Sequence, residues 1–264
     1  MLIFVFITFV QILWCSGASE WSYENQDAWP PTCKGQEQSP IQIITKNAVD
    51  SCLKNFQFNR ATSEKKKANV TNTGHTVEVR FVDESNPPTV SGGGLDGTYV
   101  FDSFHFHWAA EHVIDTHRYP LEGHFVYYSQ KYPNLESALS NKGGVAVFAV
   151  FYQKVPFVFW NSAFNFVRDI PLVAHKVDQP VTARNPVVLR DYFPKDCGGF
   201  YRYNGSLTTP DCNEVVVWTV FKRTRAISKF NKLVQIWDAE NDPVKNNYRD
   251  LQPLNGRRVL DSWC

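Results

Sequence analysis

Short stretches of the chain alternate apolar and polar residues with a period of two, the pattern of β-strands that bury one face. The clearest are residues 76–82 (TVEVRFV) and 104–108 (FHFHW). Residues 145–152 and 215–221 are instead continuously apolar and rich in β-branched side chains, as strands buried on both faces are. The dominant period of two therefore predicts a β-rich fold.

Helical periodicity is scarce, and only residues 134–140 and 228–237 favour helices. Turn-forming sequences at 86–88 (NPP) and 92–94 (GGG) separate the predicted strands. We find no internal repeat and no low-complexity linker. The pattern predicts a single, mainly β (α+β) domain built on a large, mostly antiparallel twisted central sheet with short peripheral helices.

The N-terminus differs from the rest of the chain. Residues 1–14 are nearly all apolar, and small residues follow at 15–19. The run is shorter than the roughly 20 residues that cross a bilayer, and it suits a secretory signal peptide cleaved near residue 18. No Lys or Arg precedes it, so a buried N-terminal element is the alternative. We expect a secreted, soluble mature domain over residues 19–264, with no later membrane span.

The charge balance argues against polyanionic partners. The chain has 264 residues, with 27 basic and 26 acidic side chains and a net charge of +1. Nothing in this balance calls for nucleic acid or an anionic membrane. The one charge cluster, residues 64–67 (EKKK), is expected in a solvated loop. The sequon at residues 69–71 (NVT) is a glycosylation candidate.

Six cysteines fit an exported protein, because disulfides persist outside the cytosol. If Cys15 leaves with the signal peptide, five remain, so at least one is free or pairs between molecules. We expect a monomer, with a covalent dimer through the odd cysteine as the alternative. No pair has the CxxC spacing of a cysteine-bound structural zinc.

Histidine spacing points to a metal site. His105 and His107 are two apart in a predicted strand, so both rings leave one face while Phe104 and Phe106 leave the other. Alone, such a pair is more often an ordinary polar face of a strand. His124 in the next predicted strand, residues 121–126 (LEGHFV), offers a third imidazole.

Glu122 lies on the same face as His124, where a carboxylate can accept the second ring N–H of a ligand histidine. Three imidazoles around zinc leave a fourth position open, as catalytic sites do.

Several segments resemble the α-type carbonic anhydrases and occur in the family's order. The resemblance begins at residues 21–23 (WSY), ends near 252–254 (QPL) and so covers nearly the whole mature chain. Its most specific parts are FHFHW at 104–108 and GSLTTP at 205–210, with GLDGTY at 94–99 before them and Glu111-His112 between them. The resemblance implies reversible hydration of carbon dioxide to bicarbonate, with Zn²⁺ held by His105, His107 and His124.

The resemblance also implies the roles of other residues. The Thr208 hydroxyl would accept a hydrogen bond from zinc-bound hydroxide and donate to Glu111, which orients the attack on carbon dioxide. Thr209 would contact bicarbonate, and His75 would carry the released proton to buffer. An apolar wall for carbon dioxide would consist of Leu207, Val126, Val147 and Trp218; without the resemblance, these four would be read as plain core.

Some positions depart from the family pattern. Ser103 stands where a longer glutamine usually supports the first zinc ligand, so metal affinity could fall by about 10–100-fold. Only Ala109 and Ala110 separate Trp108 from Glu111, a shorter turn than many members have. Cys33 and Cys212 match a disulfide of extracellular members, whereas Cys52, Cys197 and Cys264 are unassigned, with a Cys52–Cys197 bridge as one possibility.

Two other functions compete with a carbonic anhydrase. One is a catalytically weak or inactive member of the fold that acts as a binding or matrix protein. Such proteins typically lose a zinc histidine, whereas this chain keeps all three. The other is a zinc hydrolase of esters, which the same open site would permit as a side activity.

Overall fold

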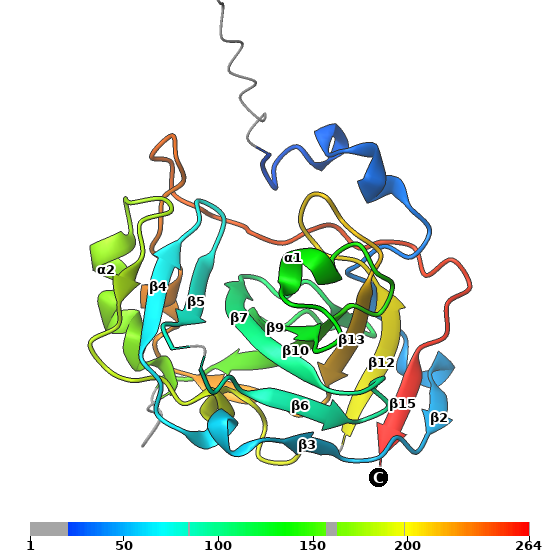
Figure 1. Ribbon diagram of the computed structural model, residues 1–264. Helices are drawn as coiled ribbons and strands as arrows, with labels where there is room; N and C mark the ends of the chain where they lie inside the picture. Colours follow the sequence, from blue (N-terminus) through cyan, green and yellow to red (C-terminus); the bar gives the residue numbers. More distant parts are fainter. Residues whose placement is uncertain (1–20, 84, 157–162, 198, 264) are drawn as a thin grey trace, which may run out of the picture.

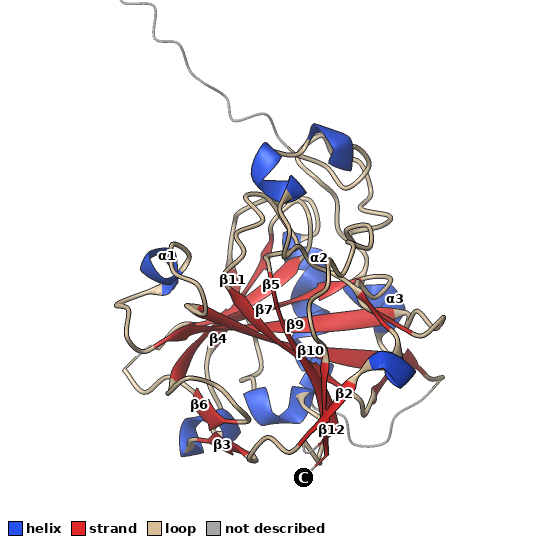
Figure 2. Cartoon of the chain, turned by 90° about the vertical axis from the view of Figure 1, so that its right-hand side faces the viewer, coloured by secondary structure: helices blue, strands red, loops and turns tan. Residues whose placement is uncertain are grey.

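A large twisted sheet dominates the computed structural model, which describes residues 21–83, 85–156, 163–197 and 199–263 (Figures 1 and 2). The predicted signal peptide, residues 1–18, lies outside the described residues. The sheet has 13 strands, in the order β11-β4-β5-β7-β9-β10-β13-β12-β15-β2, with β3, β6 and β14 off this path. Most neighbours are antiparallel, although β10 pairs in parallel with β13 and β14. The predicted fold class is confirmed.

The strands and helices have the following bounds. The strands are β1 Gln42–Ile43, β2 Val49–Ser51, β3 Phe56–Phe58, β4 Ala68–Asn72, β5 Val77–Phe81, β6 Thr89–Gly92, β7 Tyr99–His107, β8 Val113–Ile114, β9 Leu121–Ser129, β10 Val145–Lys154, β11 Val181–Thr182, β12 Gly199–Gly205, β13 Val216–Phe221, β14 Arg225–Ile227 and β15 Leu260–Trp263. The α-helices are α1 Leu135–Ala138, α2 Ile170–Val173 and α3 Phe230–Leu233, and 3-10 helices span Gln26–Ala28, Pro31–Lys34, Thr45–Asn47, Arg60–Ser63, Ala163–Asp169 and Leu189–Tyr192.

The structure contains strands at the predicted positions, whereas its helices are shorter than predicted. The helix expected over 134–140 forms as α1, where the Asn134 side chain accepts a hydrogen bond from the Ser137 amide as an N-cap. The helix expected over 228–237 is wrong in extent, because α3 covers only Phe230–Leu233. It has no side-chain cap at Lys229, and Trp237 leaves the helical path to form a β-bridge with Pro243.

The charged segment at 64–67 is also less solvated than expected. Lys66 is buried, its backbone bridges to Val187, and its Nζ donates to the carbonyl of Asn86. A long lysine can bury its stem while its ammonium group finds a partner. The prediction of a solvated loop, which rested on charge alone, is therefore wrong for Lys66.

The sheet separates two apolar clusters, which follow from the alternation of side chains along each strand. Phe104 and Phe106 belong to the larger cluster, here called the rear core, together with Phe148 of β10. Val126, Val147 and Trp218 belong to the second cluster, on the opposite face, here called the front core. Because His105 and His107 alternate with the rear-core phenylalanines, they project to the front.

A β-bulge in β7 adjusts this alternation just before the histidines. Phe101 pairs with Tyr127 and Ser103 with Val126, so Asp102 is an extra residue without a partner in β9. The insertion shifts the alternation by one position, and both Phe101 and Phe104 therefore reach the rear core. The strand β7 is therefore irregular at Asp102 and Ser103, directly before the segment that carries the histidines.

One disulfide joins the N-terminal segment to the loop between β12 and β13. Cys33 and Cys212 are bonded, across 179 residues, as the resemblance implied. Cys52 is disulfide-bonded as well, whereas Cys197 carries a free thiol, so a Cys52–Cys197 bridge is wrong. The spacing of the cysteines along the chain does not identify their partners, because only the folded chain brings distant cysteines together. Among the helices in the described part of the chain, none is both long and apolar enough to cross a bilayer.

Candidate metal centre

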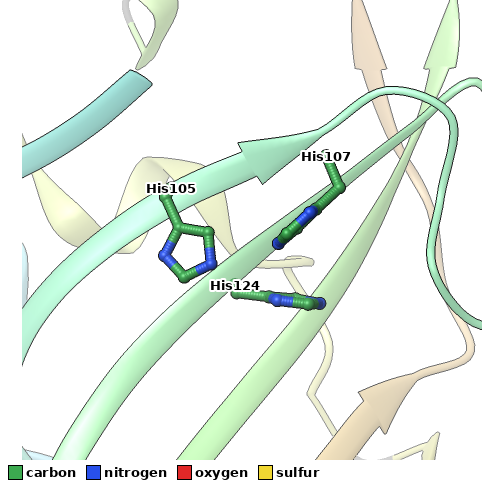
Figure 3. A group of neighbouring side chains, drawn as sticks. All are labelled: His105, His107 and His124. Carbon is green, nitrogen blue, oxygen red and sulfur yellow. The ribbon is translucent and has the colours of Figure 1, made fainter. Parts of the chain in front are cut away.

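Three imidazoles converge on the front face of the sheet (Figure 3). His105 and His107 come from β7, and His124 lies directly opposite His105 on the antiparallel strand β9. The ring centroids are 5.0 Å apart for His105–His107, 5.3 Å for His105–His124 and 4.4 Å for His107–His124. One ligand nitrogen from each ring lies within 4.8 Å of the others. Strand register thus brings together the three residues that the sequence predicted as ligands.

The tautomer of His107 is fixed by a loop from far along the chain. Its Nδ1 lies 2.6 Å from the backbone oxygen of Asn247, so Nδ1 carries the proton and donates it. Nε2 is buried and has no hydrogen-bond partner among the described residues. A buried polar atom without a partner is costly. Because Nδ1 carries the proton, Nε2 keeps a lone pair that can bind a metal ion.

Glu122 fixes the second ring. Its Oε1 lies 2.6 Å from Nε2 of His124 and 2.7 Å from Nδ1 of His112, and all three residues are buried. Because Nε2 of His124 donates to the carboxylate, Nδ1 keeps its lone pair. His112 is held further by the Tyr203 hydroxyl, 2.6 Å from its Nε2, which agrees with a structural role for this residue.

The environment keeps two of the ligand rings, those of His105 and His107, neutral, as metal ligation requires. Burial lowers the pKa of His107, and burial together with His107 and His124 lowers the pKa of His105 well below its usual value. Burial by itself raises the pKa of Glu122, but His112 and His124 outweigh it and hold that pKa well below its usual range. The site therefore combines neutral imidazoles at His105 and His107 with one ionised carboxylate, Glu122, behind them.

This donor set fits zinc. Three imidazole nitrogens on one face, with side chains fixed from behind, match a three-histidine site with an open fourth position. A second group, His112, Glu122 and His124, also satisfies the distance requirement for a metal. Its atoms are already hydrogen-bonded to one another, however, so it serves better as the support of the first.

Glu111 lies close to two of the three histidines, with carboxylate oxygens 3.6 Å from Nδ1 of His107 and 3.8 Å from Nδ1 of His124. It is fully buried, and its Oε1 accepts a hydrogen bond of 2.7 Å from the Arg249 amide. Oε2 lies 3.8 Å from Nδ1 of His124 and has no hydrogen-bond partner among the described residues. The structure records no hydrogen bond between Glu111 and Thr208, which is 5% exposed.

The loop that carries Thr208 is anchored at both ends. The Ser39 amide donates to the Ser206 hydroxyl at 2.9 Å, and the Trp218 indole donates to the Ser206 carbonyl at 3.0 Å. Four residues beyond Thr208, Cys212 is bonded to Cys33. Support of this kind holds the Thr208 hydroxyl in a fixed position.

The four residues of the predicted apolar wall belong to one apolar cluster, the front core. Val126, Val147 and Trp218 are buried in the front core, and Leu207 packs against it partly exposed. The Trp218 ring lies 4.8 Å from the His124 ring, measured between centroids. Thr209 follows Thr208 in the same loop and is partly exposed.

His75 lies in the loop between β4 and β5, half-buried and stacked on Trp21 with 3.7 Å between ring centroids. It lines an open pocket of about 440 Å³ with Trp21, Tyr23 and an acidic loop that includes Asp238 and Glu240. Burial lowers the pKa of His75, while Asp178, Asp238 and Glu240 oppose the shift. A neutral, partly solvated imidazole at neutral pH can accept a proton.

Ser103 is buried beside His105, but the structure shows no hydrogen bond between them in the described residues. Its hydroxyl pairs instead with the carboxylate of Asp102 in the bulge. Arg80 on β5 bridges Asp102 at 2.6 Å and Glu78 at 2.7 Å. An ion-paired cluster of Arg80, Glu78 and Asp102 therefore lies next to Ser103, the position where a longer glutamine was expected.

Sequence reasoning missed two residues that hold the site. Asn247 is fully buried and accepts from His107 through its backbone, while its side chain binds the Trp108 amide at 2.7 Å and the His75 carbonyl at 3.0 Å. Arg249 positions Glu111 through its amide and contacts the Cys33 carbonyl through its guanidinium. Both lie in an irregular segment without periodicity, so no sequence signal identified them.

Comparison with known proteins agrees with this geometry. The family model described as "Eukaryotic-type carbonic anhydrase" matches residues 16–263. Carbonic anhydrase 6 of Mus musculus is 32% identical over 91% of this chain and 80% of its own length. Putative carbonic anhydrase 5 of Caenorhabditis elegans is 32% identical over 96% and 86%, and carbonic anhydrase 3 of Homo sapiens is 30% identical over 93% and 99%.

Proposed function

Because the chain belongs to the eukaryotic-type carbonic anhydrase family, we propose that it catalyses the reversible hydration of carbon dioxide to bicarbonate and a proton. The observation that carries the proposal is the convergence of His105, His107 and His124 on one face of the sheet, with the lone pair of His107 Nε2 free. A member of the fold that serves only as a binding module would have no need of this group. Ester hydrolysis remains a side activity that the same site permits.

In the proposed mechanism, His105, His107 and His124 hold Zn²⁺, with Glu122 and Asn247 fixing two of the rings. When bound, zinc supplies a Lewis acid and makes a water-derived nucleophile available near neutral pH, for which carbonic anhydrase is itself the standard example. Glu111 Oε2, which has no partner in the described residues, is available to accept the Thr208 proton. The Thr208 oxygen can then only accept a hydrogen bond from the nucleophile, which orients the lone pair of the nucleophile.

The substrate's chemistry fits the front-core wall. Carbon dioxide is small and apolar overall, and Val126, Val147, Leu207 and Trp218 offer it a surface without competing hydrogen bonds. We assign Thr209 and the Thr208 amide to the charged product, bicarbonate, at the polar edge of that wall. The polar loop and the apolar wall meet at Leu207 and Thr208, where substrate becomes product.

The direct test of the proposed function is stopped-flow hydration of carbon dioxide by the purified, zinc-loaded protein. We expect hydration far above the uncatalysed rate, with zinc bound in a 1:1 ratio. A folded, zinc-loaded protein with no hydration above background would overturn the proposal and leave the binding module in its place.

His75 is proposed to pass the product proton to buffer. His75→Ala is expected to lower kcat by about 100-fold in weak buffer, the low end of general acid–base effects, with kcat/KM for carbon dioxide nearly unchanged. Added imidazole should restore the rate, because it replaces the lost proton carrier. His175→Ala, an exposed histidine stacked on Trp237, is the control. A full rate for His75→Ala in dilute buffer would remove His75 from the mechanism.

We also propose that the protein is exported as the domain of residues 19–264 after loss of its signal peptide. The Cys33–Cys212 disulfide supports this location, because such bonds are rare in a reducing cytosol. Glycosylation at Asn69 and a monomeric state remain part of the same proposal.

A further inference from the structure

Arg202 is a buried charged residue that the metal centre does not use. It lies in β12 and is 5% exposed, beside Phe200 on the rear face of the sheet. Its strand neighbour Thr219 accepts a 2.9 Å hydrogen bond from Nη2. The adjacent Trp218 points to the front and contacts His124, so Arg202 and the metal centre lie on opposite faces of the same strands.

No carboxylate neutralises Arg202 among the residues that the structure describes. Its Nε is buried without a hydrogen-bond partner. Burial lowers the pKa of Arg202 to about 10, so the guanidinium is still protonated at neutral pH. A buried charge normally has an ionic partner, since desolvation otherwise makes it costly. Stacking over Phe200, at 5.3 Å from its ring centroid, compensates only in part.

The guanidinium lines a pocket of about 310 Å³ at the end of β12, with Tyr132, Val217 and Leu260 among its walls. The pocket's one acidic group among the described residues, Asp96, has an 87% exposed side chain that is already paired with Lys131 at 2.7 Å. The interior of the pocket therefore keeps an unbalanced positive charge.

Gly94 lies against the guanidinium in the wall of the pocket. A Cβ there would lie 3.5 Å from Arg202 Nη1 and 3.0 Å from a Leu53 methyl group. Gly94 also has a φ of +76°, which disfavours any side chain. The bare backbone leaves room above the charged group.

We propose that this pocket binds a small organic carboxylate, held by the Arg202 guanidinium, on the face of the sheet opposite the metal. A planar carboxylate matches the fork of guanidinium donors, of which Nε has no other partner. Val217, Leu260 and the Tyr132 ring would contact the apolar part of the ligand. The proposal is independent of the hydration activity, because none of these residues belongs to the metal centre.

The test is an NMR titration of the zinc-loaded, full mature protein with sodium acetate at constant ionic strength, observing the Arg202 Nε–H resonance and the Gly94 and Gly143 amides. We expect saturable shifts with a dissociation constant in the millimolar range, and none with acetamide, the neutral isostere. Arg202→Gln should abolish the shifts at both glycines. Arg223→Gln, which removes an exposed arginine paired with Asp196, should keep them.

Several outcomes would overturn the proposal. They are shifts confined to the metal ligands, shifts that grow linearly without saturation, saturation by phosphate but not acetate, and unchanged glycine shifts in Arg202→Gln. The Arg202 resonance of the wild type decides the question even if Arg202→Gln does not fold. A purely structural Arg202 would change the melting temperature on substitution but would show no acetate-dependent shift in the wild type.

Discussion

Replacing His107 with alanine is expected to reduce carbon dioxide hydration to the uncatalysed rate, the largest effect of any single substitution in this chain. His107 is fully buried, and its Nε2 is the ligand atom that has no other partner. Residues that merely support metal ligands are worth about 10–100-fold in affinity, so loss of a ligand itself should exceed that range. Enzymes typically accelerate reactions by at least about 10⁶-fold, and all of this depends on the metal here.

Zinc content, measured by mass spectrometry after dialysis, and stopped-flow hydration together check this expectation. His117→Ala is the matched control, because it removes an exposed histidine outside the site. It should keep both zinc and activity. A His107→Ala protein that hydrates carbon dioxide at the wild-type rate would show that the catalytic centre lies elsewhere.

The second large effect is expected at Thr208. Thr208→Val keeps the shape of the side chain and removes its hydroxyl, so nothing would orient the nucleophile or donate to Glu111. Removal of one such hydrogen-bonding group typically costs about 10²–10³-fold in kcat. Thr208→Ser retains the hydroxyl and should retain most of the activity.

Zinc content separates this effect from that of His107→Ala. Thr208 is not a ligand, so Thr208→Val should bind zinc as the wild type does while its kcat falls. Normal kcat in the zinc-loaded Thr208→Val protein would contradict the assignment. Loss of zinc in that protein would instead indicate that the substitution disturbs the loop anchored through Ser206 and Cys212.

The errors of the sequence predictions have identifiable causes. Residues 228–237 have a helical pattern, yet only Phe230–Leu233 form a helix, because Trp237 is drawn into a bridge with Pro243. A Cys52–Cys197 bridge is wrong because Cys197 is free. The helical pattern gives way to a tertiary contact, whereas the cysteines have no local pattern that could identify their partners.

The sequence by itself determined the strands, the face on which His105 and His107 lie, and the identity of the three ligand candidates. Alternation is a local property, so a period of two is enough to separate Phe104 and Phe106 from the histidines. Motifs such as GSLTTP added the family resemblance. These conclusions needed no knowledge of which strands are neighbours.

The tertiary structure alone decided how the ligands are held and what surrounds them. The pairing of His105 with His124 depends on strand register, and the bond from His107 to Asn247 joins residues 140 positions apart. Asn247 and Arg249 lie in an irregular segment, and the buried charge of Arg202 stands out only once its neighbours are known. Long-range contacts depend on the path of the whole chain, because a residue's local pattern specifies its face but not its partner across the fold.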